Sequence, residues 1–141
     1  MGSEKLQVQD VMSTELHTLD RNDQLILADQ VMTNERMRHM PVLDGDGCLC
    51  GIVSQRDIFK SALLGALGYG SHAAEMALKT VIVKEAMTER PHTTTPETLV
   101  SDAAATMLAK KIGCLPVVSN DKLVGIITES DLITLVANGT D

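Results

Sequence analysis

The sequence predicts an α+β fold of the α/β type, built from two β-α-β-β-α units. The first observation is an internal repeat, in which residues 12–57 recur as residues 87–131 with one residue lost in a turn. A repeat of this length is a supersecondary unit that must bury its apolar face against a neighbour. The second observation is that aromatic residues make up only 1% of the chain, so the core is expected to be aliphatic.

Each copy is expected to open with a short extended segment, at residues 16–19 and 92–94, followed by a helix. Asp23 and Thr98 occupy equivalent positions there and are candidate N-caps, because their side-chain oxygens can accept hydrogen bonds from free helix amides. The helix of the second copy is the clearer one. From Val100 onward, apolar residues recur at the i, i+3, i+4, i+7 and i+8 positions of a buried helix face.

A hairpin and a second helix are expected to complete each copy. Polar turns separate pairs of apolar strands, expected at residues 40–43 and 49–53 in the first copy and at residues 115–118 and 123–127 in the second. The closing helices are expected to begin near Ser54 and Thr128. Between the copies, residues 71–79 also show a helical pattern.

The repeats define three expected parts: a first repeat at residues 8–61, a connecting helical segment at 62–82 and a second repeat at 83–138.

The formal charge of −7 disfavours binding to nucleic acid or to an anionic membrane surface. No apolar run is long enough for a transmembrane helix. The three cysteines lack disulfide or zinc spacing, and we interpret them as reduced thiols of a cytoplasmic protein.

The start of each closing helix is the candidate binding position. Thr128-x-x-Asp131 and Ser54-x-x-Asp57 both fit a capping box, in which a hydroxyl and a carboxylate accept bonds from backbone amides. Taken alone, the spacing favours this structural role. The same geometry also suits a nucleotide, because the free amides at a helix start attract a phosphate and a carboxylate can accept bonds from both hydroxyls of a ribose.

Three motifs occur twice, in the same order in both copies. They are Val11-Met12-Ser13 and Ala86-Met87-Thr88, Met40-Pro41-Val42-Leu43 and Leu115-Pro116-Val117-Val118, and Gly51-Ile52-Val53-Ser54-x-x-Asp57 and Gly125-Ile126-Ile127-Thr128-x-x-Asp131. In this order they resemble the V-M-T/S, L-P-V-V and G-h-h-S/T-x-x-D motifs of the CBS domain, named after cystathionine β-synthase. Two such domains in tandem form a Bateman module.

The resemblance implies two units packed about a pseudo-twofold axis, with crosswise sites for an adenosine-containing ligand. In family members that bind adenine nucleotides, the motif Asp holds the ribose and the Ser or Thr lies near the phosphates. The residues of the expected stronger site are His17, Thr18, Met37, Arg38, His39, Met40, Pro41, Thr128, Ser130 and Asp131. Those of the expected weaker site are His92, Thr93, Ile112, Gly113, Cys114, Leu115, Pro116, Ser54, Arg56 and Asp57.

The two expected sites differ in charge. Arg38 and His39 would supply cationic donors to a phosphate in the stronger site. Gly113 and Cys114 carry no charge at the equivalent positions, which leaves Arg56 to reach the phosphates of the weaker site. Arg38 and His39 also follow a helix end, where cations are commonly just solvated, so both interpretations stay open.

The expected function is a regulatory module, not an enzyme, that senses AMP, ADP, ATP, S-adenosylmethionine or an NAD-type ligand, with or without magnesium, and signals to an unidentified protein. Energy sensing is one such role. The alternative is a ligand-free dimerisation module. It would use apolar helix faces that suggest a homodimer, namely Ile58, Phe59, Leu63 and Leu64, and Leu132, Ile133, Leu135 and Val136. A metal or redox sensor built on Cys48 and Cys50 is disfavoured by their spacing.

Overall fold

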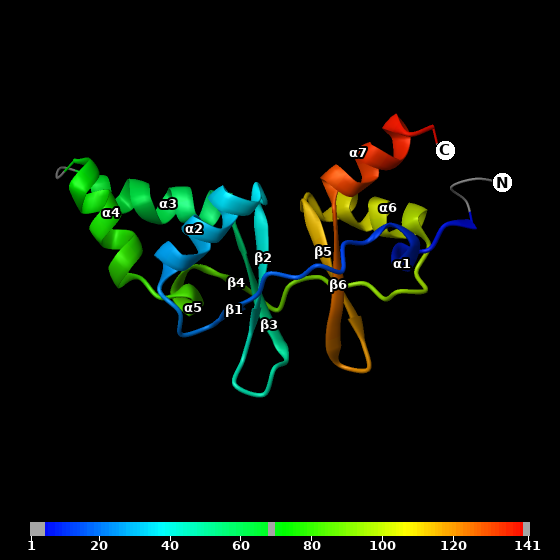
Figure 1. The fold of residues 1–141 in the computed structure, drawn as a ribbon, viewed down its shortest axis with the longest axis horizontal. Helices are drawn as coiled ribbons and strands as arrows, with labels where there is room; N and C mark the ends of the chain where they lie inside the picture. Colours follow the sequence, from blue (N-terminus) through cyan, green and yellow to red (C-terminus); the bar gives the residue numbers. More distant parts are fainter. Residues whose placement is uncertain (1–4, 68–69, 140–141) are drawn as a thin grey trace. The chain divides into compact units, whose positions relative to one another are not determined.

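A computed structural model describes residues 5–67 and 70–139, which form two compact units (Figure 1). Unit 1 takes the described residues up to Leu16 and those from His92 onward, and unit 2 takes His17–Pro91. Both units combine helices with a small sheet, and the two copies of the strand-helix-strand-strand-helix pattern confirm the predicted fold class.

Unit 2 is built around a four-stranded sheet. Its elements are β1 (Leu19–Asp20), α2 (Leu25–Glu35), β2 (His39–Leu43), β3 (Leu49–Ser54), α3 (Gln55–Ala66), α4 (Ser71–Thr80), α5 (Val83–Ala86) and β4 (Thr88–Glu89). The strand order is β1-β2-β3-β4, with β1 parallel to β2 and the other pairs antiparallel. The connecting helix α4 packs mainly against α3, which confirms the helix predicted at residues 71–79.

Unit 1 repeats this arrangement with shorter flanking strands. Its elements are α1 (Val8–Val11), α6 (Val100–Lys110), β5 (Cys114–Ser119), β6 (Lys122–Thr128) and α7 (Glu129–Ala137). The β5–β6 hairpin is flanked by single bridges, a parallel one from Thr94 to Val117 and an antiparallel one from Ser13 to Ile126. These bridges stand where β1 and β4 lie in unit 2, so the sheet order is the same.

The opening segment of each sequence repeat packs on the hairpin of the other repeat. Ser13, at the start of the first repeat, exchanges backbone hydrogen bonds of 2.9 and 3.0 Å with Ile126 of the second. Thr88, at the start of the second repeat, pairs with Ile52 of the first. The compact units therefore do not coincide with the sequence repeats, because each unit is completed by a segment from the other copy.

The core of each unit is aliphatic. In unit 2 the buried cluster is Leu19, Leu25, Ala28, Met32, Met40, Val42, Val53, Ile58, Leu78 and Val83. In unit 1 it is Val8, Ala103, Met107, Leu115, Val117 and Ile127. Val8 and Val83 come from the exchanged opening segments and are both 0% exposed, so these segments supply core volume as well as strand pairing.

Asp23 and Thr98 do not cap the first helices, so that prediction was wrong. The helices begin at Leu25 and Val100, one residue too late for either side chain, and Gln24 and Leu99 occupy the N-cap positions without a side-chain bond. The Asp23 carboxylate instead accepts a 2.8 Å bond from the Asp20 amide. The Asp23 carbonyl accepts a 2.8 Å bond from the Val83 amide of the exchanged segment, which fixes the turn in place of a cap.

One expected side-chain position also differs from the structure. Ile58 is 5% exposed and belongs to the core of unit 2, so it is not part of an exposed helix face. Its neighbour Phe59 is 68% exposed. Of the two cysteines near the hairpin turn, Cys48 precedes β3 and Cys50 lies in it. Among the described residues, no helix has the length and apolar character needed to cross a bilayer.

Candidate functional site

A capping box begins each closing helix, as the sequence predicted. In α7 the Thr128 amide donates to Asp131 Oδ2 at 2.9 Å, and the Asp131 amide donates to Thr128 Oγ1 at 3.3 Å. In α3 the matching distances are 2.8 Å from the Ser54 amide to Asp57 Oδ2 and 3.1 Å from the Asp57 amide to Ser54 Oγ. Each carboxylate is thus held in place by the backbone, with its Oδ2 atom committed.

The capping boxes leave a donor and an acceptor open at each helix start. The bonds of each box use Oδ2 of Asp131 or Asp57 and the amide of the same residue, so Oδ1 and the amide of Ser130 or Arg56 take no part in the box. The amide before each of these is occupied, because Glu129 donates to the Gly113 carbonyl at 3.1 Å and Gln55 donates to the Arg38 carbonyl at 2.8 Å.

These carbonyl contacts bring two expected site segments together within each unit. In unit 2 the Arg38 loop lies at the start of α3, and His39 pairs with Ser54 in the hairpin register. In unit 1 the Gly113 loop lies at the start of α7, and Cys114 pairs with Thr128. Figure 1 shows α7 beginning at the end of the hairpin opposite its turn.

The two helix starts carry different charges. Arg38 and Arg56 are exposed side chains at the start of α3, and the half-buried His39 lies beside them. At the start of α7, Gly113 and Ser130 hold the equivalent positions and Cys114 is buried. Burial raises the pKa of the Cys114 thiol to about 12, with a further upward contribution from the Glu129 carboxylate, so this thiol is neutral at physiological pH.

Two expected site residues point into the cores. Met40 and Leu115 are each 1% exposed and belong to the core clusters, so they can offer a ligand only their backbone. Pro41 and Pro116 are also buried, but neither belongs to a core cluster. Met37 and Ile112 are half-buried and pack against the core of their own unit.

The segments preceding the first helices are more accessible. Thr18, His92 and Thr93 are exposed. His17 is half-buried, and its Nε2 atom lies 4.0 Å from Glu35 Oε2 in α2. The sequence pattern did not indicate this contact, because nothing in a linear pattern aligns His17 with the end of the helix that follows it.

No group of three or more His, Cys, Asp or Glu side chains with metal-site geometry is present within residues 5–67 and 70–139. Cys48 is exposed, and burial together with the Asp44 carboxylate raises the pKa of the half-buried Cys50 thiol. The arrangement thus offers backbone amides, hydroxyls, carboxylates and two arginines, which suit a phosphate-bearing or ribose-bearing ligand.

Comparison with known families and proteins identifies the same two repeats. The CBS domain model matches residues 8–63 and 83–138. A homoserine O-acetyltransferase of Methanococcoides burtonii is 32% identical over 92% of this chain, but the chain spans only 24% of that protein's length. The CBS domain-containing protein DDB_G0289609 of Dictyostelium discoideum is 29% identical, with 94% of this chain and 92% of that protein covered.

Solved structures are similar over nearly the whole chain. One, described as an acetoin utilization protein (AcuB) of Vibrio cholerae, is 38% identical with a TM-score of 0.76, covering 94% of this chain and 91% of that one. The CBS domain pair of protein MJ0100, in complex with 5-methylthioadenosine and S-adenosyl-L-methionine, is 26% identical with a TM-score of 0.78 and coverage of 95% and 98%. CBSX2 in complex with AMP is 27% identical with a TM-score of 0.76 and coverage of 96% and 98%.

Proposed function

This chain belongs to the CBS domain family, and from that premise we propose that it is a regulatory module that binds an adenosine-containing nucleotide and signals to a partner protein. The observation that carries the proposal is the pair of helix starts, each with a carboxylate that the backbone holds through Oδ2, so that Oδ1 and the neighbouring amide take no part in the capping box. A ribose hydroxyl can donate to Oδ1, and a phosphate can accept from the amide.

The ligands of two similar structures support an adenosine-containing ligand. AMP, 5-methylthioadenosine and S-adenosylmethionine share the adenosine group and differ in what is attached to its 5′ carbon. A site built for all of them must hold the ribose and the adenine. The Asp131 and Asp57 carboxylates are suited to the ribose, while the arginines decide whether a phosphate is preferred.

We propose that each site is formed crosswise, with the helix start of one repeat facing residues 17–18 and 37–41 or 92–93 and 112–116 of the other. The site with Asp131 would then receive Arg38 and is the tighter one for a phosphate-bearing ligand. Met40 and Leu115 would contribute backbone alone, since their side chains fill the cores. The chain would act without catalysis, in the cytoplasm, by changing its affinity for a partner when the ligand binds.

A thermal-shift panel tests the proposal, with adenosine, AMP, ADP, ATP, S-adenosylmethionine, 5-methylthioadenosine and NAD, each with and without magnesium. A ligand at 100 times its Kd adds about 2.7 kcal/mol of stability, which raises Tm by several degrees for a chain of this size. Unchanged Tm values across the panel at millimolar concentrations would contradict the proposal.

The variants Asp131→Asn and Asp57→Asn locate the ligand more sharply than alanine variants. Asparagine keeps a carbonyl oxygen that can accept the capping bond of the Thr128 or Ser54 amide, so the helix start is preserved. It loses the negative charge that binds the ribose hydroxyls. We expect the Asp131 variant to bind AMP at least tenfold more weakly. Equal AMP affinity in wild type and both variants would exclude the helix starts as the ribose site.

A specific observation favours dimerisation as a second function. The exposed face of α3 carries Phe59, Leu63 and Leu64, which are 68%, 52% and 64% exposed, and α7 carries Ile133 and Val136 at 66% and 69%. Apolar side chains gathered in this way commonly mark an interface between copies.

Analytical ultracentrifugation tests the dimer. Phe59→Asp is expected to shift the chain toward monomer, because a carboxylate would be desolvated in the interface. Leu108→Asp is a matched control on α6, since Leu108 is an isolated apolar side chain that is 82% exposed. A monomeric wild type, or a dimer insensitive to Phe59→Asp, would remove α3 as the interface.

A further inference from the structure

Each exchanged opening segment places a methionine sulfur directly on a strand glycine. A Cβ atom built on Gly125 would lie 2.5 Å from Met12 Sδ and 3.1 Å from Met12 Cγ. A Cβ on Gly51 would collide with Met87 in the same way, at 2.9 Å from Cγ and closer still to Sδ. Neither glycine has a positive φ, so glycine is required here for space rather than for backbone conformation.

These two contacts lie at the points where the segments attach. Met12 precedes Ser13, whose amide donates to the Ile126 carbonyl at 2.9 Å, and Met87 precedes Thr88, which pairs with Ile52. The sulfur therefore sits between the short helix that supplies Val8 or Val83 to the core and the bridge to the hairpin. Loss of the sulfur–glycine contact would loosen both attachments together.

Partial exposure together with packing on a strand glycine distinguishes Met12 and Met87 from the other described methionines. Three of these, Met32, Met40 and Met107, are only 3%, 1% and 4% exposed, which shields them from a dissolved oxidant. Met76 is 44% exposed on α4, where an added oxygen can stay in water. Met12 and Met87 are half-buried, so part of each residue meets solvent while its sulfur is closely packed on a glycine. Met37 is half-buried too, but no strand glycine lies beneath it.

We propose that Met12 and Met87 are oxidation sites whose conversion to the sulfoxide loosens the opening segments from the hairpins. The oxidant is a hydroperoxide: the sulfur lone pair attacks the distal peroxide oxygen, the O–O bond breaks, and water or an alcohol leaves. The sulfur is oxidised by two electrons and the peroxide is reduced by two. The new S–O group is larger and polar, so it no longer fits the close apolar contact with a glycine Cα. The inference does not depend on a bound nucleotide.

Hydrogen peroxide titration of the intact chain tests this, with peptide mass spectrometry to assign each sulfoxide and hydrogen exchange to locate loosening. We expect oxidation at Met12 to increase exchange in residues 8–13 and 122–128, and oxidation at Met87 to do so in residues 83–89 and 49–54. We expect Tm to fall by about 4 °C. Methionine sulfoxide reductases with a thiol reductant should restore both quantities.

Leucine variants separate these sites from general oxidation. The Tm of the double variant Met12→Leu and Met87→Leu should stay unchanged after peroxide treatment. The Tm of Met76→Leu should fall, as that of the wild type does. If the double variant fails to fold, singly oxidised wild-type species separated by chromatography replace it. The proposal is overturned if Met12 and Met87 remain unoxidised in the folded chain while Met76 reacts, or if their sulfoxides form with Tm and exchange unchanged.

Discussion

The starts of α3 and α7 are the two regions whose comparison is most informative. Both have the same capping box, the same loop carbonyl on the first amide and the same hairpin register beside them. Around this common backbone, Arg38 and Arg56 in unit 2 are replaced by Gly113 and Ser130 in unit 1. The backbone geometry is retained because the fold requires it, whereas the side chains that point outward are free to differ in charge.

The outer surfaces of the units differ as well. In unit 2 the helix α4 covers α3, and Ala62 packs against the core. In unit 1, Val136 of α7, at the position equivalent to Ala62, is 69% exposed. The connecting segment therefore adds a helical layer over α3, whereas α7 has an exposed apolar side chain at the equivalent position, even though the two repeats share their motifs.

The largest expected effect is a loss of folding stability when the strand glycines are replaced, and it tests whether both units depend equally on the methionine contact. Gly125→Ala and Gly51→Ala each place a Cβ against a methionine and about 3 Å from a backbone carbonyl oxygen, that of Ser13 or Thr88. Overpacking of this kind costs about 1–3 kcal/mol, which chemical denaturation can measure. Gly45→Ala is the matched control, because nothing lies within 4 Å of its added Cβ. A loss of stability at only one of the two glycines would show that the packing of the opening segment on the hairpin matters in one unit alone.

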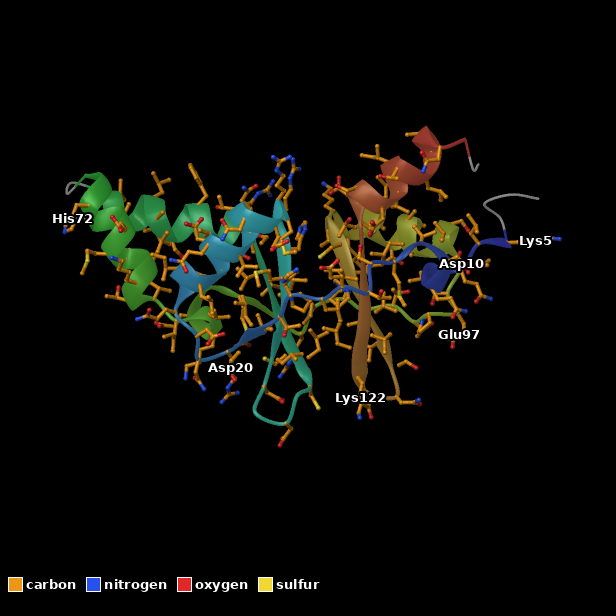
Figure 2. The ribbon with its side chains drawn as sticks, in the orientation of Figure 1. Lys5, Asp10, Asp20, His72, Glu97 and Lys122 are labelled. Atoms are coloured by element: carbon orange, nitrogen blue, oxygen red, sulfur yellow. The ribbon has the colours of Figure 1, made fainter. Side chains whose placement is uncertain are left out.

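Arg38, which the proposed crosswise arrangement brings to the site with Asp131, predicts that this site prefers a ligand with a phosphate. We expect Arg38→Ala to weaken AMP binding about tenfold, or about 1.4 kcal/mol, and to leave 5-methylthioadenosine binding unchanged, since that ligand has no phosphate. Lys122→Ala removes the same charge at the far, turn end of the β5–β6 hairpin, where Figure 2 shows Lys122, and serves as the control. Isothermal titration calorimetry measures both ligands. Equal losses for AMP and 5-methylthioadenosine would contradict a phosphate contact.

The capping hydroxyls of Thr128 and Ser54 should contribute equally to the unfolding free energy. Thr128→Ala and Ser54→Ala each remove the acceptor of the Asp131 or Asp57 amide. Each is expected to cost about 1 kcal/mol of unfolding free energy. Denaturant titration of both variants would detect any inequality, and a difference much larger than the experimental error would break the equivalence of the two helix starts.

The smallest expected effect is on folding stability at high pH and comes from Cys114, which occupies the position equivalent to His39 of unit 2. The pKa of its thiol is about 12 in the folded chain against an ordinary value of 9.0, so the folded state keeps a proton that the unfolded state releases above pH 9. Stability is therefore expected to fall as pH rises from about 9 to 12 and to be unaffected by this group at pH 7. Cys114→Ala should flatten this part of the stability profile, measured by denaturation at several pH values. An unchanged slope would mean that the thiol is not buried as the structure indicates.

Much of the local structure follows from short-range patterns. The capping boxes were predictable because a hydroxyl and a carboxylate three residues apart can bond only to nearby amides. The hairpins were predictable from apolar runs around polar turns, with boundaries that differ by at most one residue from those observed. The caps at Asp23 and Thr98 failed because backbone bonds from the exchanged segments already fix those turns, as the Val83 amide does at Asp23 and the Val8 amide at Thr98.

The sequence by itself determined the duplication, the family, the order of the elements and the two helix starts, because these depend on residues close together in the chain. Only the tertiary structure showed that residues 8–13 complete unit 1 and residues 83–89 complete unit 2, since pairing between Ser13 and Ile126 leaves no local signature. It also showed why Gly51 and Gly125 recur in both copies. Each is glycine because a methionine more than thirty residues away in the chain rests on it.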